Sequence, residues 1–122
     1  MTNSRETNDF PVVSDAAHYF YDDLVEAGAE IYEKYEAMVH SKTLTVDGEY
    51  SLVGSVNLNG RSQWRDSEGV AAISGEGMAQ ELEERFESGL STCKRVKLAD
   101  LEAESFLTNL TQWAISLFAS TM

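Results

Sequence analysis

A predicted β-hairpin constrains the fold of this chain more than any other feature of its sequence. Two runs of β-forming residues, 43–46 and 50–53, flank the dipeptide Asp47-Gly48. Both central residues of a type I′ turn need positive φ, which aspartate and glycine tolerate, so the dipeptide predicts a tight turn between antiparallel strands. The segment 54–60 is rich in glycine and asparagine, and we expect it to leave the sheet as a loop.

Helices and strands are predicted on both sides of that hairpin. Ser14 is a good N-cap, apolar residues with helical spacing follow it, and Gly28 can end that helix as its C′ residue. The complete expectation is a polar, mobile tail over 1–10, a helix over 14–28, a strand over 29–35, the hairpin, a buried strand at 70–73, a helix over 77–90 and a final helix over about 98–118. This order predicts an α/β fold, with α+β as the alternative, in which a mixed sheet is flanked by helices.

The composition of the chain limits its cellular setting and its binding partners. The 122 residues suffice for one domain, no run of about 18 apolar residues could cross a membrane, and the polar N-terminus does not resemble a secretory signal. A single cysteine, Cys93, cannot form an internal disulfide, which fits a reducing, cytoplasmic setting or the cytoplasmic face of a membrane. The formal net charge of −12 disfavours nucleic acid as a partner, because an acidic surface repels phosphate backbones.

Polar side chains that suit phosphodiester chemistry surround the hairpin. On one strand, His40 and Lys42 would be two residues apart and would face the same side. An imidazole can act as nucleophile or general acid near neutral pH, and a nearby ammonium stabilises charge on a phosphoryl oxygen. The hairpin returns Ser55 and Asn57 towards the same end, where they could donate to that phosphate. Glu68, just before the next predicted strand, could bind the imidazole and fix its orientation.

The spacing of these residues resembles a known motif. A His-x-Lys pair alone is usually surface decoration, but here the pattern continues as His40-x-Lys42-(four residues)-Asp47-(six residues)-Gly54-Ser55-x-Asn57. This pattern resembles, without a gap, the HKD motif of the phospholipase D superfamily. The flanking segments 14–35, 58–62 and 85–98 resemble the surroundings of the second HKD motif in bacterial cardiolipin synthases, so the resemblance covers roughly residues 9–98.

The resemblance implies a role for each matched residue. In that superfamily two HKD motifs meet at one active site, where one histidine forms a phosphohistidine and the other protonates the leaving oxygen and then activates the acceptor. Carried over, His40 is the nucleophile or, as the histidine of a second motif, more often the general acid and base. Lys42, Ser55 and Asn57 would hold the phosphate, and Glu68 stands where the family has its histidine-orienting glutamate. No metal or cofactor is expected.

Other positions bear on how far the resemblance extends. Asp47 completes the catalytic motif, although its implied role is to stabilise the site and not to act as a base. Gln63 and Asp66 stand where cardiolipin synthases usually have a large apolar residue and an asparagine, which weakens the assignment of a substrate class. The family domain also has a strand, a helix and a strand before the matched part. We therefore expect an N-terminally incomplete, phospholipase D-like domain over 11–98, between the tail at 1–10 and an amphipathic helix at 99–122.

Three functions are compatible with the sequence. The first is a phosphatidyltransferase or phosphodiesterase that resembles cardiolipin synthase, takes a phospholipid substrate, and needs a second HKD half from the same longer protein or from another chain. The second is a homodimeric single-HKD phosphodiesterase or nuclease, and the third is a non-catalytic interaction module. The final helix could pack against the domain core, which its lack of basic residues favours, or lie on a membrane surface through Phe106, Trp113 and Phe118.

Overall fold

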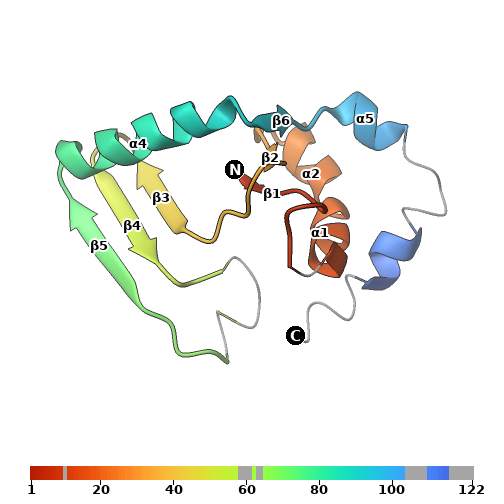
Figure 1. Ribbon diagram of the computed structural model, residues 1–122, viewed down its shortest axis with the longest axis horizontal. Helices are drawn as coiled ribbons and strands as arrows, with labels where there is room; N and C mark the ends of the chain where they lie inside the picture. The colour runs from red at the N-terminus through yellow and green to blue at the C-terminus, as the bar shows by residue number, and fades with distance from the viewer. Residues whose placement is uncertain (10, 58–61, 63–64, 104–109, 116–122) are drawn as a thin grey trace. The chain divides into compact units, whose positions relative to one another are not determined.

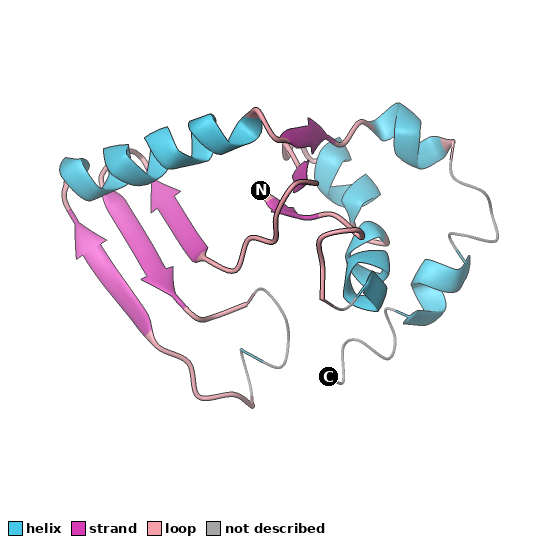
Figure 2. Ribbon diagram, in the orientation of Figure 1, coloured by secondary structure: helices cyan, strands magenta, loops and turns pink. Residues whose placement is uncertain are grey.

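The chain folds into small sheets flanked by helices (Figures 1 and 2). The computed structural model describes residues 1–9, 11–57, 62, 65–103 and 110–115. The elements follow one another in the order β1, α1, α2, β2, β3, β4, β5, α4, β6, α5. The predicted mixed α/β class is confirmed.

The chain divides into two compact units. Unit 1 contains residues 1–39 and 92–122, and unit 2 contains residues 40–91. The predicted division into a tail, one domain over 11–98 and a separate helix differs from this arrangement. The reason is that the chain leaves unit 1 after β2 and returns to it to form β6, which pairs with β2.

Unit 2 is built on the predicted hairpin. β3 (Lys42–Val46), β4 (Tyr50–Gly54) and β5 (Val70–Ser74) form an antiparallel sheet in that order, and α4 (Glu76–Leu90) follows. In the turn, Asp47 and Gly48 have φ of 54° and 66°, and Glu49 N–H donates to the Val46 carbonyl at 3.1 Å. The hairpin is therefore confirmed. The predicted strand at 70–73 and helix over 77–90 are also confirmed, to within one residue at each end, but the strand is not buried as predicted: Val70, Ala71 and Ala72 are exposed.

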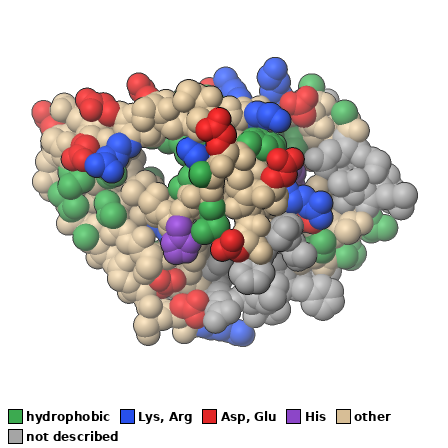
Figure 3. Space-filling view, in the orientation of Figure 1, with side chains coloured by type: hydrophobic (Ala, Val, Ile, Leu, Met, Phe, Trp, Pro, Cys, Tyr) green, Lys and Arg blue, Asp and Glu red, His purple; other side chains and the backbone are tan. Residues whose placement is uncertain are grey.

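The two faces of the unit 2 sheet are covered differently. α4 packs against β3 and β4, and the side chains of Ser51 on β4 and Ala79 on α4 are buried. Within the described part of the chain the Ser51 hydroxyl has no hydrogen-bond partner. The opposite face carries Leu44, Leu52 and Val70, which are exposed, and Figure 3 shows hydrophobic side chains gathered over this sheet. One face therefore forms a core and the other is open.

The sheet of unit 1 mixes parallel and antiparallel pairs. Its central strand is β2 (Tyr32–Lys34), with β1 (Thr2–Asn3) parallel on one side and β6 (Cys93–Arg95) antiparallel on the other. The helices of unit 1 include α1 (Pro11–His18), α2 (Tyr21–Glu26) and α5 (Leu98–Glu102). Among the residues whose burial is described, the buried apolar side chains of these helices are Ala16, Tyr21 and Leu101.

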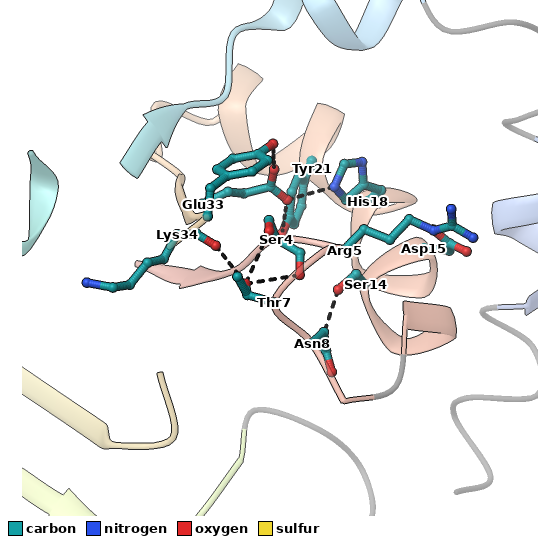
Figure 4. Close-up of polar contacts among 11 residues, drawn as sticks. Ser4, Arg5, Thr7, Asn8, Ser14, Asp15, His18, Tyr21, Glu33 and Lys34 are labelled. Atoms are coloured by element: carbon teal, nitrogen blue, oxygen red, sulfur yellow. Dashed lines mark hydrogen bonds and ion pairs between the residues drawn. The ribbon is translucent and has the colours of Figure 1, made fainter. Parts of the chain in front are cut away.

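The N-terminal residues belong to this sheet, so the prediction of a mobile tail is wrong for residues 1–9. The side chain of Asn3 binds both backbone groups of Val39: Nδ2 donates to the carbonyl at 2.9 Å, and Oδ1 accepts from the amide at 2.7 Å. Ser4 N–H and Thr7 Oγ1 both donate to the Lys34 carbonyl, at 3.1 and 2.7 Å (Figure 4). The polar side chains that suggested a solvated tail instead satisfy backbone groups at the end of β2 and at Val39.

The first predicted helix is divided in two. α1 begins at Pro11, a residue favoured in the first turn of a helix, and Ser14 lies inside α1 instead of capping it. α1 ends at His18 and α2 begins at Tyr21. The aromatic run 19–21 crosses the break, and aromatic side chains lose rotamer freedom in a helix.

The predicted end of that helical region at Gly28 is confirmed. Gly28 has φ of 93°, and its N–H donates to the Val25 carbonyl at 3.0 Å. Ala29 N–H donates to the Leu24 carbonyl at 2.9 Å, which completes a Schellman motif. Because Ala29 closes α2, β2 is shorter than the strand predicted over 29–35.

A buried carboxylate joins α1, α2 and β2. Glu33 Oε1 lies 2.7 Å from His18 Nε2 and accepts from the Tyr21 hydroxyl at 3.5 Å, while Oε2 accepts from the Tyr35 hydroxyl at 3.1 Å (Figure 4). Burial by itself would raise the pKa of Glu33. The hydrogen bonds from the histidine and the two tyrosines, together with the histidine charge, outweigh burial and lower that pKa below its ordinary value.

Acid is expected to weaken unit 1 through Glu33. Because the pKa is lowered in the folded state, the ionised carboxylate stabilises the fold above the ordinary carboxyl pKa, and this contribution is lost as the pH falls through the lowered value. We expect Glu33→Gln to lower the thermal midpoint of unfolding most at neutral pH and progressively less on acidification. Glu83→Gln, at an exposed position on α4, should follow the wild type throughout. A Glu33→Gln deficit that stays constant with pH would contradict this assignment.

The C-terminal region differs from the single helix predicted over 98–118. α5 ends at Glu102, Ala103 lies in a turn, and residues 110–115 are helical again. Of the aromatic residues proposed to face a membrane, Trp113 is exposed, whereas Phe106 and Phe118 lie outside the described residues. Among the described helices, none has both the length and the apolar character needed to cross a bilayer.

Candidate functional site

The predicted site residues gather at one end of the unit 2 sheet. In the register of the sheet, Lys42 on β3 lies opposite Gly54 on β4, which lies opposite Val70 on β5. At this end β3 begins, β4 ends and β5 begins. The antiparallel order therefore also brings together the residues just outside these strands, Ser55 after β4 and Glu68 before β5.

The backbones of β4 and β5 approach each other closely at this end. Ser55 N–H donates to the Gly69 carbonyl at 3.0 Å, and Gly69 N–H donates back to Ser55 Oγ at 3.1 Å. A Cβ atom on Gly54 would lie 2.3 Å from the Gly69 carbonyl oxygen and 2.9 Å from the Val70 Cα. Glycine is the residue that permits this approach, and the approach fixes the Ser55 hydroxyl next to the backbone that leads to Glu68.

The carboxylate of Glu68 is the centre of a hydrogen-bond network. It accepts a hydrogen bond from the Ser55 hydroxyl, and its Oε1 accepts another from Ser62 Oγ at 2.6 Å. The bond from Ser55 is the largest cause that lowers the pKa of Glu68, and the bond from Ser62 is the next. The positive charge of Lys42 also lowers it, and desolvation opposes the shift. These contacts therefore favour the ionised form of the carboxylate.

Glu68 is expected to titrate below 4.5, the ordinary value for a glutamate. A ¹³C NMR titration of its side-chain carboxyl group would measure this midpoint. Ser55→Ala and Ser62→Ala should each raise the midpoint, because each removes a hydrogen bond to the ionised form. Ser74→Ala, at the opposite end of β5, should leave it unchanged. A wild-type midpoint at or above 4.5 would be incompatible with the network.

Ser62 connects the side-chain amide of Asn57 to the carboxylate of Glu68. The motif in the sequence had assigned no role to Ser62. Asn57 Nδ2 donates to Ser62 Oγ at 3.4 Å, and the same hydroxyl donates to Glu68. A hydroxyl can accept and donate at once, so the buried Ser62 bridges the two side chains. The sequence did contain a signal that Ser62 matters: the segment 58–62, which ends at this serine, resembles the family's sequence.

His40 lies outside the strand on which it was predicted. β3 begins at Lys42, so the expectation that both side chains extend from one strand is wrong. Lys42 Nζ donates to the His40 carbonyl at 2.6 Å. The imidazole is exposed and, in the part of the chain that the structure describes, has no hydrogen bond to Glu68 or to another side chain.

Asp47 takes no part in this cluster. It lies in the turn at the other end of the hairpin, a distance of roughly 16 Å from Lys42 at the rise of an extended strand. The structure places Asp47 apart from the other residues of the motif, in a turn where it adopts the positive φ that the turn requires.

A cavity in unit 1 involves none of the predicted site residues. It is open, has a volume of about 400 Å³, and is lined by Arg5, Glu6, His18, Glu33 and Tyr35. Across the described ranges, no three histidine, cysteine or carboxylate side chains gather as a metal site would require.

Comparison with known proteins agrees with the motif. The family model described as "Cardiolipin synthase, PLD-like domain" matches residues 1–90. Cardiolipin synthase A of Pectobacterium carotovorum subsp. carotovorum is 36% identical over 106 residues, which cover 87% of this chain and 19% of that protein. Cardiolipin synthase A of Serratia proteamaculans is 40% identical over 75 residues, and that of Escherichia coli O1:K1 is 41% identical over 75 residues; each match covers 62% of this chain and 15% of the relative.

The chain thus spans less than a fifth of the length of these relatives. The family match, in contrast, covers most of the chain and includes every residue of the hydrogen-bond network around Glu68. The chain belongs to the family of cardiolipin synthase PLD-like domains.

Proposed function

We propose that the chain supplies one HKD half of a phospholipase D-type phosphatidyltransferase. The observation that carries this proposal is the convergence of Lys42, Ser55, Asn57 and Glu68 at one end of the unit 2 sheet. An ammonium, a hydroxyl and an amide at one place suit the binding of a phosphodiester. His40 lies two residues before Lys42, as the motif requires.

In the proposed reaction, two histidines share the chemistry. The histidine of one half attacks phosphorus, the bond from phosphorus to the leaving alcohol breaks, and the histidine of the other half gives its proton to that leaving oxygen. The acceptor alcohol then loses its proton to the second histidine as it attacks the phosphohistidine, which restores both groups. We assign His40 to the acid and base role. Lys42, Ser55 and Asn57 hold the phosphate, and Glu68 is a positioning residue that acts through the two serines bound to it.

A phospholipid is the proposed substrate, because the curated relatives described above are named cardiolipin synthase A. The proposal requires a second HKD half, carried by the same longer protein or by another chain. It also requires contact with a membrane surface, where a phospholipid is found. The net charge of −12 disfavours a nucleic acid as the phosphodiester.

The test is an exchange of matching segments. The part of Escherichia coli cardiolipin synthase A that aligns with this chain is replaced by residues of this chain, so that the first half of the enzyme is retained. Phosphatidylglycerol vesicles serve as substrate, and lipid products are quantified by mass spectrometry. We expect transfer by the chimaera and none by the separate 122-residue chain at concentrations where it is monomeric.

Two results would contradict the proposal. One is transfer by the monomeric chain, because the reaction needs two histidines. The other is a folded chimaera whose activity does not depend on Lys42, because this ammonium is proposed to bind the phosphate. Lys42→Met removes the charge and keeps most of the side-chain volume. The matched variant Lys97→Met, in the segment between β6 and α5, should retain activity.

A further inference from the structure

The backbone on both sides of His40 is held by side chains from elsewhere in the chain. His40 lies in the segment that connects β2 to β3 (Figure 1). Before it, Asn3 Nδ2 donates to the Val39 carbonyl at 2.9 Å, and Asn3 Oδ1 accepts from the Val39 N–H at 2.7 Å. After it, Lys42 Nζ donates to the His40 carbonyl at 2.6 Å. Three successive peptide units around this histidine therefore each have a hydrogen bond to a side chain.

The contact between Asn3 and Val39 imitates a pair of β-strand residues. In such a pair, two residues exchange both N–H and C=O hydrogen bonds, and an asparagine side chain carries the same acceptor and donor. The two residues are 36 positions apart in the sequence. Asn3 itself lies in β1, opposite Lys34 of β2, so its side chain reaches Val39 from a paired strand. The contact therefore ties the backbone just before His40 to the sheet of unit 1.

The imidazole of His40 has no comparable support of its own. It is exposed and, among the described residues, makes no hydrogen bond to a side chain. Glu68, to which the resemblance assigns the orientation of the imidazole, binds Ser55 and Ser62 instead. Because peptide units are planar, the direction of the His40 Cα–Cβ bond depends on how the two flanking units are oriented. Restraining both units leaves the imidazole only the rotations of its own side chain.

We propose that Asn3 is a positioning residue for His40, acting through the backbone of Val39. This role rests on the proposed function, in which His40 exchanges a proton with the leaving and attacking oxygens. A general acid must lie within hydrogen-bond reach of the oxygen that it protonates, and a displacement of about 1 Å can lower a rate by about 10²-fold. The HKD motif begins at His40 and contains no residue that could provide this restraint from the N-terminal side.

NMR on the full chain tests the restraint without any activity. In the wild type we expect a backbone order parameter near 0.85 at His40, the value typical of rigid structure, and Asn3→Ala should lower it below about 0.6. Hydrogen exchange of the Val39 amide should accelerate roughly tenfold, because this variant removes its acceptor. Asn8→Ala is the matched control: the Asn8 amide also belongs to unit 1 but donates to Ser14 Oγ at 3.0 Å. It should leave both values unchanged.

The chimaeric enzyme tests the consequence for transfer, provided that it contains Asn3, which lies within the family match over residues 1–90. We expect Asn3→Ala to lower kcat by roughly 10- to 100-fold, less than the loss of the imidazole itself. KM should stay within about twofold of its original value, because the side chains that hold the phosphate are unchanged. Asn8→Ala should keep both constants, and assays well below the thermal midpoints of unfolding separate this effect from a loss of folded enzyme.

Three outcomes would overturn the positioning role. They are an order parameter of His40 that Asn3→Ala leaves unchanged, equal losses of kcat in Asn3→Ala and Asn8→Ala, and a loss that appears in KM while kcat is kept. Failure of the proposed function would be seen differently, as a folded chimaera that is inactive although it retains Asn3. The NMR measurements on the separate chain would then still decide whether Asn3 holds the backbone of His40.

Discussion

His40→Ala is expected to lower the rate of phosphatidyl transfer by roughly 10²- to 10⁴-fold, the range typical of a lost general acid or base. The imidazole is exposed, and the described hydrogen bond between His40 and Lys42 uses the backbone carbonyl, so the substitution removes the reacting group and leaves the fold in place. The loss should appear in kcat more than in KM, because other side chains are proposed to hold the phosphate. Product formation by the chimaeric enzyme, measured together with its thermal midpoint, checks this expectation.

Asp47→Asn is the matched control for His40→Ala. It changes a residue of the same motif, but one that lies in the turn at the opposite end of the hairpin. Asparagine accepts positive φ, and Asn-Gly is a favoured type I′ turn, so the hairpin should keep its shape. We expect activity close to wild type. A loss as large as that of His40→Ala would show that the aspartate acts directly in the chemistry.

Gly54→Ala is expected to destabilise unit 2 by about 1–3 kcal/mol, the cost of inserting a methyl group where no space exists. The added Cβ would meet backbone atoms of Gly69 and Val70, which cannot rotate away as a side chain can. β4 and β5 must then separate, and the two hydrogen bonds between Ser55 and Gly69 are lost. The measurements are the free energy of unfolding and the titration of Glu68, which should move up towards 4.5 as the Ser55 bond is lost.

Gly69→Ala provides the comparison for Gly54→Ala. Gly69 precedes Val70, the residue opposite Gly54 in the register of β4 and β5, but a Cβ on Gly69 would have no atom within 4 Å. We expect this variant to fold with nearly wild-type stability and to keep the low Glu68 midpoint. Equal losses in both variants would mean that chain flexibility, and not the close approach of two backbones, explains the need for glycine at Gly54.

Local signals in the sequence predicted the elements that form from local interactions. Asp47-Gly48 predicted the hairpin because the two-residue turn depends on positive φ at those two positions, and both residues have it. Gly28 predicted the end of α2 for the same physical reason. The hairpin also predicted that Ser55 and Asn57 lie near Lys42, because an antiparallel partner strand returns the chain to the end at which β3 begins.

The wrong prediction for the N-terminal segment involves partners that are distant in the sequence. The N-terminal segment has a solvated composition, yet its polar groups bind the backbone of Lys34 and of Val39, more than 25 residues away. Hydrophobic periodicity depends on residues that are close together in the sequence, so it does not predict hydrogen bonds to distant backbone groups.

The sequence by itself determined the hairpin, the mixed α/β class and the membership of the chain in its family, because turn chemistry, hydrophobic alternation and motif spacing are all local properties. The tertiary structure alone decided that Ser62 bridges Asn57 to Glu68, that Asp47 lies away from the cluster, and that one sheet face is open. These outcomes depend on strand register and on which face a helix covers. Both are set by the packing of whole elements and the pairing of their polar groups, which no single segment specifies.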